Sequence, residues 1–385
     1  MTALTQLAED ERLFFDTVLE FAKQRIAPKV SEMDEQAALD TSLLPALFEL
    51  GVMGIEIPEQ YGGSGASFFN AILAVEALAR VDPSVSVLVD VQNTLVINAL
   101  LRWANAEQKA RYLPKMAAGE EIWAQGWSEP NAGSDMAAIR ATARTDGDDY
   151  VLNGQKTWCS RAAFADWLFG IFRTDPGSER HRGLTFILVP LDQPGVRVRP
   201  IAQLDGETGF AEVFFDDVRV PHEHRLGEEG QGWKVAMATA GFERGLMLRS
   251  PARFQATARR LIGLYRRQAA ADPVLRDAVV RAWMDAEAYA LNTYWTACRL
   301  IAGGTIGAEA SLNKIFWSEM DLRMHETALG LLGAEAELTA DAPASTDTDG
   351  WLDGFLFSLA GPIYAGTNEI QRNVIAERLL RLPRD

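Results

Sequence analysis

The sequence contains very little cysteine, because only Cys159 and Cys298 occur among its 385 residues. Since no secretory signal precedes them, no disulfide framework is expected, and both are predicted to be packing residues in a reducing cytoplasm. The N-terminus also lacks the basic start of a signal peptide and the Arg-rich pattern of a transit peptide. No apolar run reaches the roughly 18 residues typical of a membrane span. These absences predict a cytoplasmic protein that does not cross a membrane.

Positive charge is also scarce: 37 Lys and Arg stand against 53 Asp and Glu, a formal net charge of -16. A negative field repels polyanions, so non-specific binding to nucleic acid or anionic lipid is not expected. Any anionic ligand must then be held by a local group of basic side chains or backbone amides. Histidine is rare as well, with four residues and none beside Cys or carboxylates at ligand spacing. His222 and His224 come nearest to a metal pattern, but a solvated loop is the prediction there, and no metal site is expected.

The chain is long and rich in apolar residues. At roughly 150 residues per domain, 385 residues predict two or three domains. Apolar residues recur at helical spacing in residues 1–120, the period shortens to that of strands in 121–226, and helical spacing returns in 227–385. The pattern therefore predicts a mainly α-helical protein with a β-domain at its centre.

Two segments of the predicted β-domain carry specific signals. Asn153-Gly154, inside the apolar run from Tyr150 to Trp158, is typical of a β-hairpin turn. The stretch from Trp127 to Asp135 combines small residues and free backbone amides with a hydroxyl, which favours a concavity for a pyrophosphate. Alone, that stretch is equally typical of an ordinary Pro and Gly turn in which Asp135 caps the next element.

In combination, four segments resemble the signatures of the acyl-CoA dehydrogenase family, in the family's order and over nearly the whole chain. They are the flavin signature Trp127–Asp135, the second flavin strand with Trp158-Cys159-Ser160, the exit from the β-domain Asp216–Pro221, and the C-terminal signature Ile363–Arg372. The first half resembles short/branched-chain members, and the tail after Arg372 resembles bacterial members that shorten bulky side chains, including those of steroids. The resemblance implies a helical domain, a central β-barrel domain and a C-terminal four-helix bundle, with FAD as cofactor.

The resemblance also implies the sites of cofactor and substrate. FAD is expected against Trp127 and Ser128, with Trp158 and Ser160 closing the other side near the flavin N5. Residues Thr367 and Glu369 are expected to contact FAD near the end of the chain. The remaining implied positions are Gly133 and Ser134 along the pyrophosphate or thioester, and Ser134, Arg244 and Tyr364 as contacts of the acyl-CoA.

The catalytic base is where the sequence departs from the commonest pattern. Many relatives carry Glu where this chain has Ala365, and a methyl group cannot accept a proton. Other members place the base on an earlier helix just before an Arg, so the resemblance points to Glu243, which precedes Arg244. The backbone N-H of Ala365 is still expected to bind the thioester oxygen, because only the amide is used. The alternatives are that Glu243 is an exposed helix carboxylate paired with an arginine, and that Glu369 is the base.

The glycine-containing motifs by which relatives clamp the adenine end of FAD are not recognisable, and Arg266 and Arg267 are the only basic candidates there. This departure keeps a partner-dependent subunit of a heteromeric enzyme open as an alternative. A flavin-dependent oxygenase or oxidase on the same fold is the other. By resemblance, the acceptor is an electron-transferring flavoprotein and the assembly a homotetramer, with a heterotetramer as the alternative. The sequence does not define the acyl group.

Overall fold

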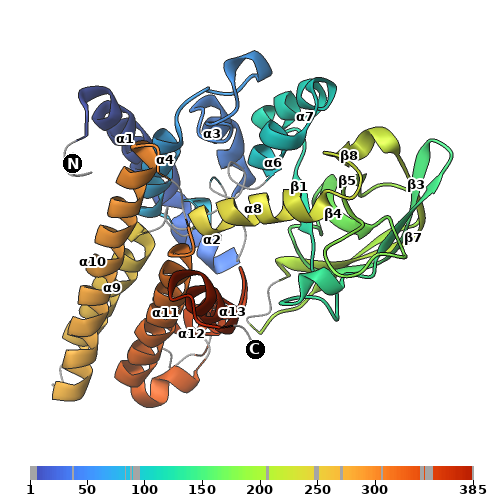
Figure 1. The fold of residues 1–385 in the computed structure, drawn as a ribbon. Coiled ribbons are helices and arrows are strands. Elements are labelled where there is room, and N and C mark those ends of the chain that lie inside the picture. The colour runs from blue at the N-terminus through green and yellow to red at the C-terminus, as the bar shows by residue number, and fades with distance from the viewer. Residues whose placement is uncertain are drawn as a thin grey trace. The chain divides into compact units, whose positions relative to one another are not determined.

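The computed structural model describes most of the chain (Figure 1). The described residues are 7–36, 39–82, 84–86, 89, 96–204, 208–246, 251–268, 272–304, 307–338, 342 and 350–383, without the side chains of 34–36, 240–246 and 301. Two compact units form: unit 1 comprises Met1–Val30, Ile72–Leu88 and Arg244–Asp385, and unit 2 comprises Ser31–Ala71 and Val89–Glu243. The division into domains 1–120, 121–226 and 227–385 remains our proposal.

Helices occupy both ends of the chain, as their apolar spacing predicts. Before the strands they are α1 (Glu9–Phe21), α2 (Val30–Gln36), α3 (Leu44–Glu49), α4 (Phe68–Ala79), α6 (Ile97–Trp103) and α7 (Ala106–Ala118). After the strands they are α8 (Gly232–Leu246), α9 (Pro251–Arg267), α10 (Pro273–Ile301), α11 (Ala310–Leu332), α12 (Trp351–Ser358) and α13 (Asn368–Val374). The core of unit 1 lies between α9, α10 and α11, where Phe254, Leu261, Tyr289, Trp317 and Met320 are buried together. This core supports the loop that follows α12, where the C-terminal signature lies.

A single sheet dominates unit 2. Its strands are β1 (Trp123–Gly126), β2 (Thr142–Asp146), β3 (Asp149–Ser160), β4 (Trp167–Arg173), β5 (Leu184–Pro190), β6 (Val196–Ile201), β7 (Phe210–Pro221) and β8 (Arg225–Leu226). The strand order is β6-β7-β3-β2-β4-β5-β8, and β1 pairs with β4. The helical, β, helical order of the elements is thus as predicted.

The predicted closed β-barrel is wrong for the residues that the structure describes, because the end strands β6 and β8 do not pair with each other. One physical reason is that β8 has only two residues, too few to complete a ladder. The other is that β6 has the alternation of an edge strand, with Arg197 and Arg199 lying over the ring of Phe214 on β7. Charged side chains of this kind are typical of a strand that ends a sheet.

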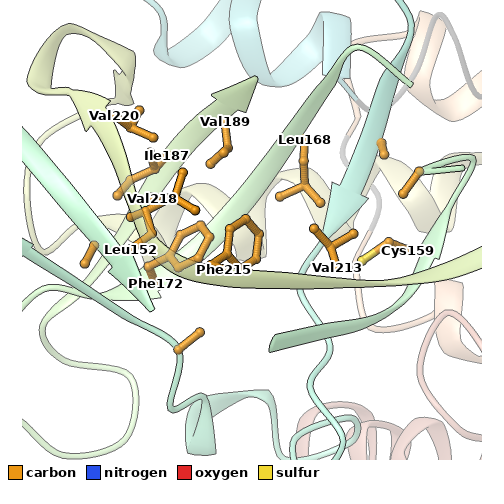
Figure 2. Close-up of a cluster of buried hydrophobic side chains, with 14 of the residues drawn as sticks. Leu152, Cys159, Leu168, Phe172, Ile187, Val189, Val213, Phe215, Val218 and Val220 are labelled. Carbon is orange, nitrogen blue, oxygen red and sulfur yellow. The ribbon is translucent and has the colours of Figure 1, made fainter. Parts of the chain in front are cut away.

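The sheet is held by a dense apolar core (Figure 2). Strands β4 and β5 are buried along six of their seven residues, so they form continuous apolar runs rather than alternating ones. Figure 2 shows the side chains of this core packed toward one another, among them Leu152, Phe172, Ile187, Phe215 and Val218. The core includes Ala124 of β1, the strand that leads into the first flavin signature, and Cys159 of β3, the strand that carries the second.

Asn153-Gly154 is not a hairpin turn, so that prediction is wrong. Strand β3 continues through both residues, and its register against β7 shifts between Leu152 and Gly154, as in a β-bulge. Gly154 has a φ of 136°, and a Cβ there would lie 2.7 Å from Cα of Ala141. The actual turn joins β2 to β3 at Gly147, whose φ is 65°. Asn-Gly favours positive φ, which serves a bulge as well as a turn.

Two expected absences concern metals and membranes. In the described ranges, no group of three or more His, Cys, Asp or Glu side chains is placed to hold a metal ion. None of the described helices combines the length and the hydropathy that a membrane span requires.

The prediction of a solvated loop at His222–His224 is wrong for His224, which is buried against Trp167 with ring centroids 5.3 Å apart.

Candidate active site

The first flavin segment leaves the sheet at the end of β1. Trp127 is buried and packs edge-on against the rings of Phe169 and Phe186, with centroids 6.2 and 6.0 Å away. The carbonyl oxygen of Ser128 accepts a hydrogen bond from the N-H of Thr157 on β3, at 2.9 Å. The first and second flavin segments, far apart in sequence, are therefore bonded side by side.

The second flavin segment has a strained backbone. Trp158 has a φ of 57° and Arg161 a φ of 65°, in the left-handed region that non-glycine residues rarely adopt. The turn leaves 58% of Trp158 exposed, and its ring packs edge-on against Phe210, with centroids 6.0 Å apart. Ser160 next to it is half-buried. Strain of this kind persists where surrounding structure enforces it, and it concentrates at functional sites.

Cys159, between Trp158 and Ser160, is not reactive. Cys159 is fully buried in the sheet core, and burial raises the pKa of its thiol to about 12. A thiol that stays protonated at neutral pH is a weak nucleophile. Cys159 is therefore a packing residue, as predicted.

The last residues of the first flavin segment form a solvent-exposed loop. Gly133 and Ser134 are exposed, and a Cβ added to Gly133 would meet no atom within 4 Å. Asp135 pairs with Arg180 at 3.1 Å. With the exposed ring of Trp158, this loop supplies an aromatic face for a planar ring system and amides and hydroxyls for phosphate oxygens. These donors fit FAD.

The C-terminal signature in unit 1 contains a second strained turn. Ala365 has a φ of 54° and Gly366 a φ of 84°. The amide of Gln371 lies beside both of their carbonyl oxygens, with Nε2 at 3.4 and 3.3 Å, and its Oε1 accepts from Ser311 at 2.8 Å. Among the described residues, the backbone N-H of Ala365 has no acceptor. A backbone N-H that is not used within its turn, in a turn fixed by a neighbouring side chain, can donate to a developing oxyanion.

The residue before this turn is anchored in the core of unit 1. The ring of Tyr364 packs on Trp317 at 5.7 Å, and burial raises the pKa of its hydroxyl to about 12. Beside it, Arg253 on α9 pairs with Asp321 on α11 at 3.0 Å. The guanidinium of Arg253 also donates a hydrogen bond to the hydroxyl oxygen of Tyr364. The turn at Ala365 is thus fixed to two helices.

The residues after the turn begin α13. Thr367 caps the helix through its side chain, which accepts from the N-H of Ile370 at 3.2 Å. Asn368 is buried, and its Oδ1 accepts from Lys314 at 2.8 Å. Glu369 is exposed, and its own backbone N-H and the Thr367 hydroxyl lower the pKa of its carboxyl group. A carboxylate with a lowered pKa is a weaker base than usual.

The two sets of predicted residues lie on different units: Trp127, Ser128, Gly133, Ser134, Trp158 and Ser160 on unit 2, and Tyr364, Ala365, Thr367 and Glu369 on unit 1. Each set is brought together within its own unit. Glu243 and Arg244 lie in α8, but their side chains are outside the described residues.

Sequence reasoning missed the charged residues behind these segments, which are the buried Glu129, Lys156, Lys314 and Asp321 and the half-buried Arg253. None of them carried a usable signal, since even Lys156 lies between the polar residues Gln155 and Thr157 in a strand of mixed composition.

Comparison with known proteins agrees with this geometry. Sequence profiles of the acyl-CoA dehydrogenase N-terminal, middle and C-terminal domains match residues 8–120, 124–218 and 230–380. Acyl-CoA dehydrogenase IpdE1 of Mycobacterium tuberculosis is 40% identical over 330 residues, 85% of this chain and 84% of that protein. The mitochondrial short/branched chain specific acyl-CoA dehydrogenase of Bos taurus is 33% identical over 98% of this chain and 87% of that protein. A solved steroid acyl-CoA dehydrogenase, Tcur3481-Tcur3483, has a TM-score of 0.87 at 25% identity over 99% of each chain. The chain therefore belongs to the acyl-CoA dehydrogenase family and is a flavin-dependent oxidoreductase, as its four motifs predicted.

Proposed function

We propose that the protein oxidises an acyl-CoA thioester to the trans-2-enoyl-CoA, with Glu243 as the base that removes the α-proton. The observation that carries this assignment is Ala365, which has no proton-accepting side chain but keeps the free backbone N-H of the turn. Since the turn retains the amide and lacks the carboxylate, the base must come from another element.

Three residues of the chain have separate roles in this reaction. The N-H of Ala365 donates to the thioester oxygen, which acidifies the α-carbon as negative charge develops on that oxygen. The carboxylate of Glu243 takes the α-proton and thereby acts as the general base. Arg244 supplies positive charge for the CoA moiety, which the negative net charge makes necessary. Trp127, Ser128, Trp158 and Ser160 would hold FAD, which would supply the acceptor for the hydride that leaves the β-carbon.

Glu369 is disfavoured as the base by its surroundings. Its carboxylate already accepts its own backbone N-H and the hydroxyl of Thr367, and these bonds lower its pKa. Proton transfer to such a group is less favourable than to a desolvated carboxylate. Glu369 is better suited to hydrogen bonding with the cofactor.

Substitution of Glu243 tests the proposal. Glu243→Gln should keep bound flavin and its visible spectrum but lose roughly 100- to 10,000-fold in the rate at which acyl-CoA bleaches it anaerobically. Glu369→Gln tests the alternative base, and Glu326→Gln, at an exposed position on α11, is the matched control that should bleach at a rate near that of the wild type. Bleaching by Glu243→Gln at the wild-type rate would remove Glu243 as the base, and loss in Glu369→Gln alone would transfer the role to Glu369.

The substrate class that we propose is a bulky or branched acyl group. Replacement of a glutamate by Ala365 leaves space beside the α-carbon, and the similarity to a steroid acyl-CoA dehydrogenase supports a large acyl chain. We further propose an electron-transferring flavoprotein as the acceptor, a homotetramer as the assembly, and the cytoplasm as the location. A chain that binds FAD only with a second subunit would instead be part of a heterotetramer.

A further inference from the structure

A buried ion pair lies directly behind the two flavin segments of unit 2. Nζ of Lys156 is 2.8 Å from Oε1 of Glu129, and 0% and 7% of the two side chains are exposed. Lys156 is on β3, two residues before Trp158, and Glu129 follows Ser128 directly. The pair therefore sits on the inner side of segments whose outer side carries the exposed Trp158 ring.

Each partner of the pair is bonded to backbone as well. Lys156 donates to the carbonyl oxygen of Ile171 on β4 at 2.6 Å and lies 3.5 Å from that of Trp127. The two carboxylate oxygens of Glu129 accept the N-H groups of Arg140 at 2.7 Å and Ala141 at 2.9 Å. One ion pair thus ties together the exit from β1, the start of β2, and strands β3 and β4.

Stability alone is a weak reason for such a pair. Removing two charges from water costs several kcal/mol per ion, and apolar replacements of similar size are often as stable. Burial lowers the pKa of Lys156, and Glu129 opposes that shift. What apolar side chains would not reproduce is the set of directed bonds to four backbone groups. These bonds fix where the backbone of Trp127 and of the strained Trp158 turn lies.

We propose that Lys156 and Glu129 are positioning residues for the flavin ring, acting through the backbone of Trp127–Ser128 and Thr157–Trp158 and not by contact with the cofactor. The inference rests on the proposed function, because it takes these segments as the ring's binding site. It extends that function by naming the groups that hold the segments in register, through the 2.9 Å bond from Thr157 to Ser128.

The test is Lys156→Met in the full chain, which removes the ammonium group but keeps a long side chain. The matched control is Val220→Ala, because Val220 is buried in the same core, paired with Tyr150 at the other end of β3. Both variants lose stability, but only the first loses the bonds behind the flavin segments. Glu129→Gln is the milder second variant if Lys156→Met does not fold, since the amide oxygen can still accept one N-H.

Two quantities are measured, the dissociation constant of FAD and the hydrogen-exchange rate of the Thr157 amide. Each variant is measured at the same number of degrees below its own Tm. The dissociation constant of FAD should rise about tenfold or more in Lys156→Met and less than about twofold in Val220→Ala. Hydrogen exchange at the amide of Thr157 should accelerate only in the Lys156 or Glu129 variant. Equal changes in the Lys156 and Val220 variants would overturn the proposal. If the wild type binds no FAD, the proposed function fails, and the exchange rate of Thr157 still decides whether the pair fixes the segments.

Discussion

At the scale of single residues, Ala365 is the most informative position, because it holds a left-handed φ of 54° with a side chain that disfavours it. Glycine adopts this region without the roughly 1–2 kcal/mol penalty of other residues, but it makes the unfolded chain more flexible. Ala365→Gly should therefore raise the free energy of unfolding by about 0.5 kcal/mol, measured by denaturant titration. Ala288→Gly, on helix α10, should lower it by about 1 kcal/mol. Destabilisation by both would mean that the turn is not strained at Ala365.

The same position tests the substrate class. Ala365→Glu places a carboxylate in the space that we assign to a branched or bulky acyl group. The ratio of kcat/KM for a bulky acyl-CoA to that for a straight-chain one should fall about tenfold or more. Steady-state kinetics on the two thioesters measure the ratio directly. An unchanged ratio would show that this space does not select the acyl group.

What the sequence reveals of the site is uneven at this scale. Trp158 and Ala365 were recognisable because their neighbours form family motifs. Their strained backbone was not, since it depends on partners distant in sequence: Ser128 bonds to Thr157 next to one turn, and Ser311 holds Gln371 against the other. Lys156 was missed because a lysine in a strand ordinarily faces solvent.

At the scale of elements, periodicity was a reliable guide and local turn signals were not. Helical spacing predicted the two helical regions because each helix buries one face against neighbours. Asn153-Gly154 was misassigned because a bulge and a turn require the same positive φ, and pairing with β7 decides between them. Pairing between distant strands is not visible in a local pattern, which is also why closure of the sheet was predicted wrongly.

Two buried histidines on different elements predict how stability depends on pH. Burial lowers the pKa of His224, after β7, and of His325, on α11, where Nδ1 donates to the carbonyl oxygen of Asp321 at 2.9 Å. Unfolding restores the ordinary pKa of about 6.5, so the unfolded chain binds more protons below that pH. The stability that these residues contribute is therefore present above about pH 6.5 and lost as pH falls toward the folded pKa.

The measurement is the free energy of unfolding between pH 7.5 and 5.5. His325→Gln should reduce the loss of stability over this range, because one of the two protons taken up on unfolding is removed. His181→Gln, at an exposed position, controls for loss of a histidine as such. A decline of the same steepness in His325→Gln and the wild type would exclude His325 as a source.

At the scale of the whole molecule, one apolar surface stays exposed among the residues that the structure describes. The outer face of α10 carries large exposed side chains at positions 280, 284, 291 and 295, whose spacing of four, seven and four places them on one side of the helix. They are Val280, Met284, Leu291 and Trp295, with Trp283 beside them, and each is 46–68% exposed. A stripe of this kind is typical of a subunit interface, and it is the surface we assign to the tetramer.

Leu291→Glu should therefore break the assembly, because a carboxylate in an apolar interface loses its hydration without gaining a partner. Leu13→Glu on α1 is the matched control, since both leucines are 68% exposed and receive the same charge. Light scattering after size-exclusion chromatography should give a smaller particle for Leu291→Glu and the wild-type mass for Leu13→Glu. Weaker binding of FAD by the dissociated variant would show that the cofactor site includes a neighbouring subunit. An intact tetramer in Leu291→Glu would exclude this face of α10, whereas dissociation without loss of FAD affinity would confine the cofactor to one subunit.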